Sequence, residues 1–84
     1  MQKFASKLHV DWFRVLTDLH YRGLRSQVIA DRIGVARSTI LGWKQGAEPK
    51  HADGELLLAL WMHVTERARG DLSMVSVPRW HRRR

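Results

Sequence analysis

Hydrophobic residues recur every three or four positions along most of the chain. Positions with this spacing share one face of a helix, so the pattern predicts a series of amphipathic helices. The segments that show it are residues 11–22, 26–33, 36–44 and about 53–69. Glycines separate these segments, and glycine ends helices readily because it adopts the left-handed conformation at little steric cost. We therefore expect an all-α domain of four to five short helices.

The ends of the expected helices carry residues that favour helix ends. Asp11 can accept a hydrogen bond from a free backbone N–H group of the first helix, and Asp53 can do the same for the fourth. Arg67 and Arg69 fall in the last turn of the fourth helix, where cations interact favourably with the helix dipole. Residues 46–54 contain two glycines and a proline, which predicts a loop before that helix.

Residues 72–84 differ from the rest of the chain. Residues 72–77 have a weak strand-like alternation before Pro78, and the segment ends in three arginines. We therefore divide the chain into a helical domain, residues 1–71, and a basic tail, residues 72–84. Three interpretations of the tail stay open: a strand for dimerisation, an extended arm and a disordered end.

The net charge of the chain limits the classes of partner that it is expected to bind. Lys and Arg number 15 against 8 Asp and Glu, which gives a net charge of +7 and favours polyanionic partners. Acidic residues outnumber basic ones only in residues 48–71, so the middle segment and the tail are the parts expected to attract phosphate. Cysteine is absent, which excludes disulfides and thiolate chemistry and fits a reducing cytoplasm.

Catalytic and metal chemistry find little support in the sequence. The five histidines form no pair at metal-ligand spacing on one helix. A glycine-rich phosphate loop, a nucleophile elbow and a cleft-forming pair of carboxylates are all missing. The longest apolar run, Leu56–Met62, is much shorter than the about 20 residues of a membrane span. We expect a binding protein without enzyme activity, metal, cofactor, membrane span or secretion signal.

The most specific pattern lies in residues 23–46. Ala30 is small where the second and third helices must approach, and Gly34 permits a sharp turn between them. Val35, Ile40 and Trp43 have the size to fill the angle that two steeply crossing helices leave. Each of these positions therefore has a steric reason for its residue type.

This segment resembles the helix-turn-helix of the phage lambda-type repressor and Cro family. The Trp43–Lys44 pair, Pro49–Lys50 and a leucine-rich helix ending in Trp61 are also similar to phage CII-type activators. The resemblance covers about residues 11–65 and implies a lambda-repressor-like bundle with its helix-turn-helix at about residues 26–45. Ala36 departs from the family pattern, which has a hydroxyl residue at the cap of the third helix.

The third helix supplies the candidate contacts to bases. If Ile40 and Trp43 face inward, the other faces point toward a major groove, and the candidates there are Arg37, Ser38, Leu41 and Gly42. The guanidinium of Arg37 can bind both major-groove acceptors of guanine. A solvated Arg37 and an inward-packed Leu41 are the competing interpretations.

Contacts to phosphate are expected at the start of the second helix and around the third. In the family that the chain resembles, the loop after the third helix runs beside the sugar-phosphate backbone. Free N–H groups at a helix start also suit phosphate. The candidates are Ser26, Gln27, Thr39, Lys44, Gln45 and Lys50.

The fourth segment is apolar over more than half of its circumference, which exceeds one core-facing stripe. Either residues after 72 cover the second stripe, or the same helix of a second copy does. The candidate residues for an interface between copies are Leu57, Trp61, Val64, Met74, Val75 and Val77.

These observations predict a sequence-specific double-stranded DNA-binding regulator of transcription, of phage or prophage type. We expect a homodimer that reads an inverted-repeat operator in the cytoplasm of a bacterial host, at the nucleoid. The alternative is a phage interaction or assembly protein that uses the same helices to bind a host or phage protein.

Overall fold

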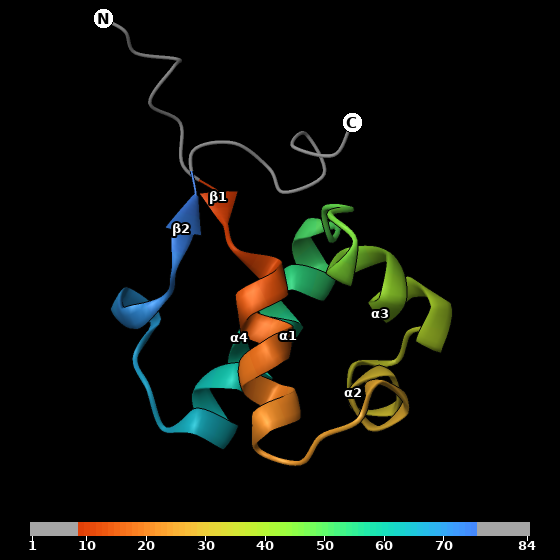
Figure 1. Ribbon diagram of the computed structural model, residues 1–84, viewed down its shortest axis with the longest axis horizontal. Helices are drawn as coiled ribbons and strands as arrows, with labels where there is room; N and C mark the ends of the chain where they lie inside the picture. Colours follow the sequence, from red (N-terminus) through yellow and green to blue (C-terminus); the bar gives the residue numbers. More distant parts are fainter. Residues whose placement is uncertain (1–8, 76–84) are drawn as a thin grey trace, which may run out of the picture.

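The computed structural model describes residues 9–75 of the chain (Figure 1). The described part is a small, mostly helical domain of four α-helices with a minor two-stranded antiparallel sheet. The elements follow in the order β1 (His9–Val10), α1 (Trp12–Tyr21), α2 (Ser26–Ile33), α3 (Arg37–Lys44), α4 (His51–Thr65), the 3-10 helix η2 (Arg69–Asp71) and β2 (Met74–Val75). The helical expectation is confirmed, and the sheet is an addition to it.

All four helices contribute to one hydrophobic core. α1 lies in front of α4 in Figure 1, and α2 and α3 lie together on one side of this pair. The core residues are Val15, Leu16, Leu19, Ile29, Ala30, Ile33, Ile40, Trp43, Leu57, Leu58 and Trp61. Residues spaced three or four apart in α1, α2 and α3 thus share a buried face, as their sequence pattern predicted.

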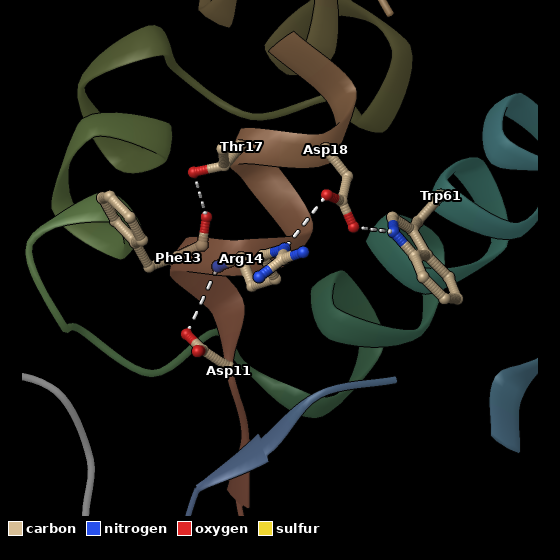
Figure 2. Close-up of polar contacts among 6 residues, drawn as sticks. All are labelled: Asp11, Phe13, Arg14, Thr17, Asp18 and Trp61. Carbon is tan, nitrogen blue, oxygen red and sulfur yellow. Dashed lines mark hydrogen bonds and ion pairs between the residues drawn. The ribbon is translucent and has the colours of Figure 1, made fainter. Parts of the chain in front are cut away.

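The start of α1 is capped by its own sequence. Asp11 is the N-cap residue, and its Oδ1 atom accepts a hydrogen bond of 3.3 Å from the backbone N–H of Arg14 (Figure 2). The helix ends before Gly23, which has a φ of 93°. Only glycine adopts this conformation without strain, so the chain can turn sharply toward α2.

Asp18 joins α1 to α4. Its Oδ2 atom accepts a hydrogen bond of 3.0 Å from Nε1 of Trp61, and its Oδ1 atom accepts one of 3.2 Å from Nε of Arg14 (Figure 2). Trp61 is only 1% exposed, so its indole N–H has lost access to water. Asp18 supplies an acceptor for this N–H group. A buried donor without a partner would destabilise the fold.

The boundaries predicted for α4 are wrong at both ends. The helix begins at His51 with Lys50 as its N-cap, so Asp53 does not cap it. Gly54 lies inside the helix and packs against the ring of Trp12: a Cβ at this position would lie 3.1 Å from Cη2 of Trp12. α4 ends at Thr65, and Glu66 follows in the left-handed conformation with a φ of 59°.

Arg69 lies beyond α4 rather than in its last turn. Its Nη1 and Nη2 atoms donate hydrogen bonds of 3.1 and 2.9 Å to the two carboxylate oxygens of Glu55. The hydrogen bonds from Arg69 lower the pKa of Glu55 below its ordinary value, and the same pair raises the pKa of Arg69. This contact ties the segment after α4 to the start of that helix.

A strand, one of the three interpretations open for the tail, is present at Met74–Val75, and it pairs within the chain. β2 runs antiparallel to β1, with His9 opposite Val75 and Val10 opposite Met74. The N–H of Asp11 extends the ladder by donating to the carbonyl of Ser73 at 2.9 Å. The remainder of the tail, including Val77 and the terminal arginines, lies outside the described residues.

Part of the interface predicted between copies is wrong. Leu57 and Trp61 are 0% and 1% exposed and belong to the core, so they have no surface to offer a second copy. Val64 is partly buried against the same core. Met74 and Val75 pair with β1, and Met74 remains 45% exposed, so nothing in the structure excludes Met74 from such an interface. No helix within residues 9–75 is long and apolar enough to cross a membrane.

Candidate nucleic-acid interface

The turn between α2 and α3 sets the geometry of the candidate site. Gly34 has a φ of 89° and ends α2 in the left-handed conformation. The N–H groups of Gly34 and Val35 both donate to the carbonyl of Ala30, at 2.7 and 3.0 Å. The turn is therefore short, and α3 crosses α2 steeply (Figure 1). The glycine turn predicted at this position is confirmed.

Buried side chains hold α3 in a defined rotation. Ile40 and Trp43 are 0% and 4% exposed, so the inner face of α3 is fixed against the core. The opposite side carries Arg37 and Ser38, both exposed, and the half-buried Thr39, Leu41 and Gly42. The predicted base-contacting residues thus lie on the outer sides of one helix. Leu41 is half-buried, and it is not among the partly buried hydrophobic residues that pack against the core.

The starts of α2 and α3 face one surface hollow. Its lining residues are His20, Arg25, Ser26, Gln27, Val28 and Arg37. Arg25 and Arg37 therefore border the same hollow. A hollow lined by two arginines favours an anionic ligand.

Neither helix start is capped by a side chain. Arg25 and Ala36 are the N-cap residues of α2 and α3, and neither side chain accepts a hydrogen bond from the helix. The first N–H groups of a helix have no intrahelical acceptor. An approaching phosphate oxygen can accept from such groups, and the helix dipole favours its negative charge.

The residues expected to contact phosphate differ in how accessible their side chains are. Ser26 is 8% exposed, so it contributes mainly through its backbone. The side-chain amide of Gln27 donates to Asp31 at 2.9 Å, so Gln27 must break or share that bond to reach a ligand. Gln45 and Lys50 are exposed, whereas Lys44 is half-buried. Thr39 offers only a partly exposed hydroxyl.

Unpaired cations gather around α2 and α3. Within residues 9–75, the arginines that form ion pairs are Arg14, with Asp18, and Arg69, with Glu55. The residues Arg25, Arg37, Lys44 and Lys50 have no acidic partner in the same part of the chain. These cations remain available to an external anion. Among residues 9–75, the one acid–base contact that reaches the loop after α3 is that of His9 with Glu48, at 3.7 Å.

Sequence reasoning missed Arg25 and His20. Arg25 precedes α2 and is exposed. The sequence signal for it was an arginine directly before the start of the second helix. His20 donates from Nδ1 to the carbonyl of Leu24 at 2.8 Å and so braces the turn that leads into α2. Its Nε2 atom is buried without a partner among the described residues. The ring therefore lines the hollow without offering it a hydrogen-bond donor.

The described chain shows no grouping of side chains for a metal. Within residues 9–75, no three His, Cys, Asp or Glu side chains lie close enough together to hold an ion. Comparison with protein-family models, curated proteins and solved structures finds no match. The sequence pattern and the geometry of α2 and α3 therefore carry the functional argument.

Proposed function

We propose that this chain is a sequence-specific double-stranded DNA-binding protein of the helix-turn-helix type that regulates transcription in a phage or prophage. The observation that carries the proposal is the presentation of α3. Its inner face is fixed by Ile40 and Trp43, and Arg37 and Ser38 at its start are exposed. A recognition helix needs both properties, because base readout requires a rigid helix with free polar side chains at its leading end.

In the proposed complex, α3 enters the major groove with its N-terminal end first. Arg37 donates both arms of its guanidinium to N7 and O6 of a guanine, and Ser38 bonds a neighbouring base or phosphate. Leu41 contacts a thymine methyl group. Each good bidentate contact of this kind is worth about 1–3 kcal/mol of discrimination against a wrong base.

Gly42 supports a close approach between α3 and DNA. The fold does not require a glycine here: its φ is not positive, and an added Cβ would meet nothing nearer than Cβ of Ala47, at 4.0 Å. Glycine inside a helix nevertheless costs about 1 kcal/mol relative to alanine. A ligand whose backbone passes close to the helix gives this position a reason to lack a side chain.

Phosphates on either side of the groove would be bound by the unpaired cations and by the helix starts. Arg25 and the first N–H groups of α2 suit one strand, and Lys44, Gln45 and Lys50 suit the other. These contacts carry no base information, but they supply most of the affinity and make it depend on salt. A single α3 spans only a few base pairs, so the proposal includes a homodimer on an inverted repeat.

Selection of bound sites from random duplexes tests the proposal. We expect one enriched sequence, and we expect affinity for it to fall steeply between about 50 and 200 mM salt. The rival function, docking to a host or phage protein, predicts no enriched sequence. Failure to enrich any sequence, with binding no tighter than that of an unrelated protein of equal net charge, would reject DNA recognition.

A further inference from the structure

Two adjoining hollows lie along the outer side of α1. The larger one is lined by Phe13, Arg14, Thr17, Asp18, Tyr21 and Arg67. The smaller one shares three of these residues, Asp18, Tyr21 and Arg67, and adds Arg22 and Thr65. Because of the shared residues, the two hollows form one surface between α1 and the segment that follows α4. We call this surface the α1 groove.

The α1 groove is separate from the candidate nucleic-acid interface. The buried side chains of α1, Val15, Leu16 and Leu19, belong to the core, and the groove lies on the opposite side of the helix. In Figure 1, α2 and α3 lie on one side of α1, and the segment after α4 lies on the other. The groove shares no lining residue with the hollow at the starts of α2 and α3. A ligand can therefore occupy each surface independently.

The groove exposes aromatic surface to water. Tyr21 is 90% exposed and Phe13 is 39% exposed. They lie eight residues apart on α1, so two helical turns, or about 12 Å, separate them along the axis. Tyrosine and arginine are among the residues that contribute most to the affinity of protein interfaces, because their side chains combine apolar area with hydrogen-bond donors.

The groove also carries a surplus of positive charge. The Nε atom of Arg14 lies 3.2 Å from Oδ1 of Asp18 and offsets the charge of this carboxylate (Figure 2). Arg22 and Arg67 are exposed and form no ion pair with any residue of the described segment 9–75. Nη1 of Arg22 donates to the carbonyl of Val64 at 3.3 Å, so its guanidinium is held beside the groove rather than extended into water.

We propose that the α1 groove binds an acidic segment of a partner protein that also carries a large apolar side chain. Charge complementarity favours this occupant, because carboxylates bind guanidinium groups in a bidentate geometry. Carboxylates of the segment accept hydrogen bonds from Arg22 and Arg67, and its apolar side chain packs against the ring of Tyr21. A segment with only one of these features leaves the other half of the groove unmatched.

The aromatic rings distinguish this occupant from a DNA duplex. Phosphates could pair with the arginines, but the bases of an intact duplex are already stacked on one another and offer no face to Tyr21 or Phe13. The inference goes beyond the proposed function and does not depend on it. It gives the chain a second binding surface that stays accessible when α2 and α3 are occupied.

Selection from a displayed library of short random peptides, with the full chain as the target, tests the proposal. We expect enriched peptides that combine several Asp or Glu residues with a Trp, Phe or Leu. Fluorescence anisotropy with one enriched peptide then measures its dissociation constant. We expect Arg67→Glu and Tyr21→Ala each to raise this constant by at least about tenfold. Both positions are exposed, so circular dichroism should show an unchanged fold.

A matched variant controls for the general attraction of a basic chain to acidic peptides. Arg32→Glu makes the same change of charge at an exposed arginine of α2 outside the groove, and we expect it to change the dissociation constant by no more than about twofold. Two altered peptides separate the contributions of charge and ring. Replacing the acids by their amides, or the large apolar residue by alanine, should each abolish tight binding.

Three results would overturn the proposal. The first is the absence of acidic peptides among those enriched. The second is a peptide that Arg67→Glu binds as tightly as the native chain does. The third is displacement of the peptide by single-stranded oligothymidylate at a lower concentration than by free peptide, which would assign the groove to unpaired bases. Site selection from random duplexes with Arg67→Glu distinguishes the two proposals, because DNA recognition through α3 should persist in this variant whether or not it binds the peptide.

Discussion

The α1–α4 pair and the α2–α3 pair differ in where their polar side chains find partners. In the first pair Asp11 caps α1 and Asp18 accepts the indole N–H of Trp61, although α4, too, begins without a side-chain cap. In the second pair the helices begin at Arg25 and Ala36 without a side-chain cap. The arginines that form ion pairs also belong to the first pair and the segment after it.

This difference suggests that α1 and α4 mainly stabilise the fold, whereas the outer surface of α2 and α3 is available for binding. A missing N-cap costs about 1 kcal/mol per helix, but it leaves N–H groups free to meet an external acceptor. The hydrophobic core that α2 and α3 share with α1 and α4 offsets this loss of stability. A change in one pair should therefore affect stability, and a change on the outside of the other should affect binding.

The largest effect is expected from Trp61→Ala. Removing this buried ring leaves a cavity and an unpaired Asp18, which should lower the free energy of unfolding by about 3–5 kcal/mol. Urea denaturation followed by circular dichroism measures the loss. Arg37→Ala, on the exposed side of α3, should change the same free energy by less than about 0.5 kcal/mol. Similar losses of unfolding free energy for the two variants would contradict the proposed division between a stabilising pair of helices and a binding pair.

Arg37→Ala should instead weaken DNA binding. We expect a cost of about 1–3 kcal/mol on the selected duplex and a smaller cost on random duplexes, because a base contact is lost. Fluorescence anisotropy with both duplexes measures this difference. The control is Arg67→Ala, an exposed arginine that follows α4. Equal losses on both duplexes would reassign Arg37 to a phosphate.

Gly42→Ala should move stability and binding in opposite directions. The added methyl group has room within the fold, so the variant should be more stable by about 1 kcal/mol. The same methyl group should hinder close approach of DNA and weaken binding. Gly34→Ala, at a φ of 89°, should lower stability because alanine is strained there. A Gly42 variant that binds DNA as tightly as the native chain would remove the close-approach argument.

The smallest effect concerns the exposed pair of Glu55 and Arg69. The hydrogen bonds from Arg69 lower the pKa of Glu55, so the pair stabilises the fold at neutral pH and loses this effect as the pH falls through the lowered pKa. In Arg69→Ala, NMR titration should show the Glu55 pKa rising to its ordinary value. The small stability difference from the native chain should close at acidic pH. An unchanged pKa would show that the pair does not persist in solution.

The helices that sequence reasoning located well are those with a strong local signal. α2 and the end of α3 match their predicted bounds because each has a single apolar face and a glycine close after it. The start of α4 could not be found in this way. Asp53 is a good cap in isolation, but the helix begins at His51 and continues through Gly54, where the ring of Trp12 packs closely. This contact joins residues far apart in the chain.

The inward face of α4 also escaped prediction. Leucines lie on nearly every side of the helix, so their spacing does not show which side faces inward. Packing against the other helices decides that Leu57 is buried and Leu56 exposed. The partner of β2 is another distant segment that no local pattern reveals. For the candidate site, the positions on α3 followed from Ile40 and Trp43. The hollow shared by Arg25 and Arg37 depends on the crossing of two helices.

The central claim is that the outer surface of α2 and α3 binds DNA. NMR measurement of backbone amide shifts during titration with the selected duplex tests it most directly. The account predicts the largest shifts at residues 25–28, 36–42 and 44–50. Duplex-induced shifts confined to β1, β2 and the outer side of α1 would contradict it.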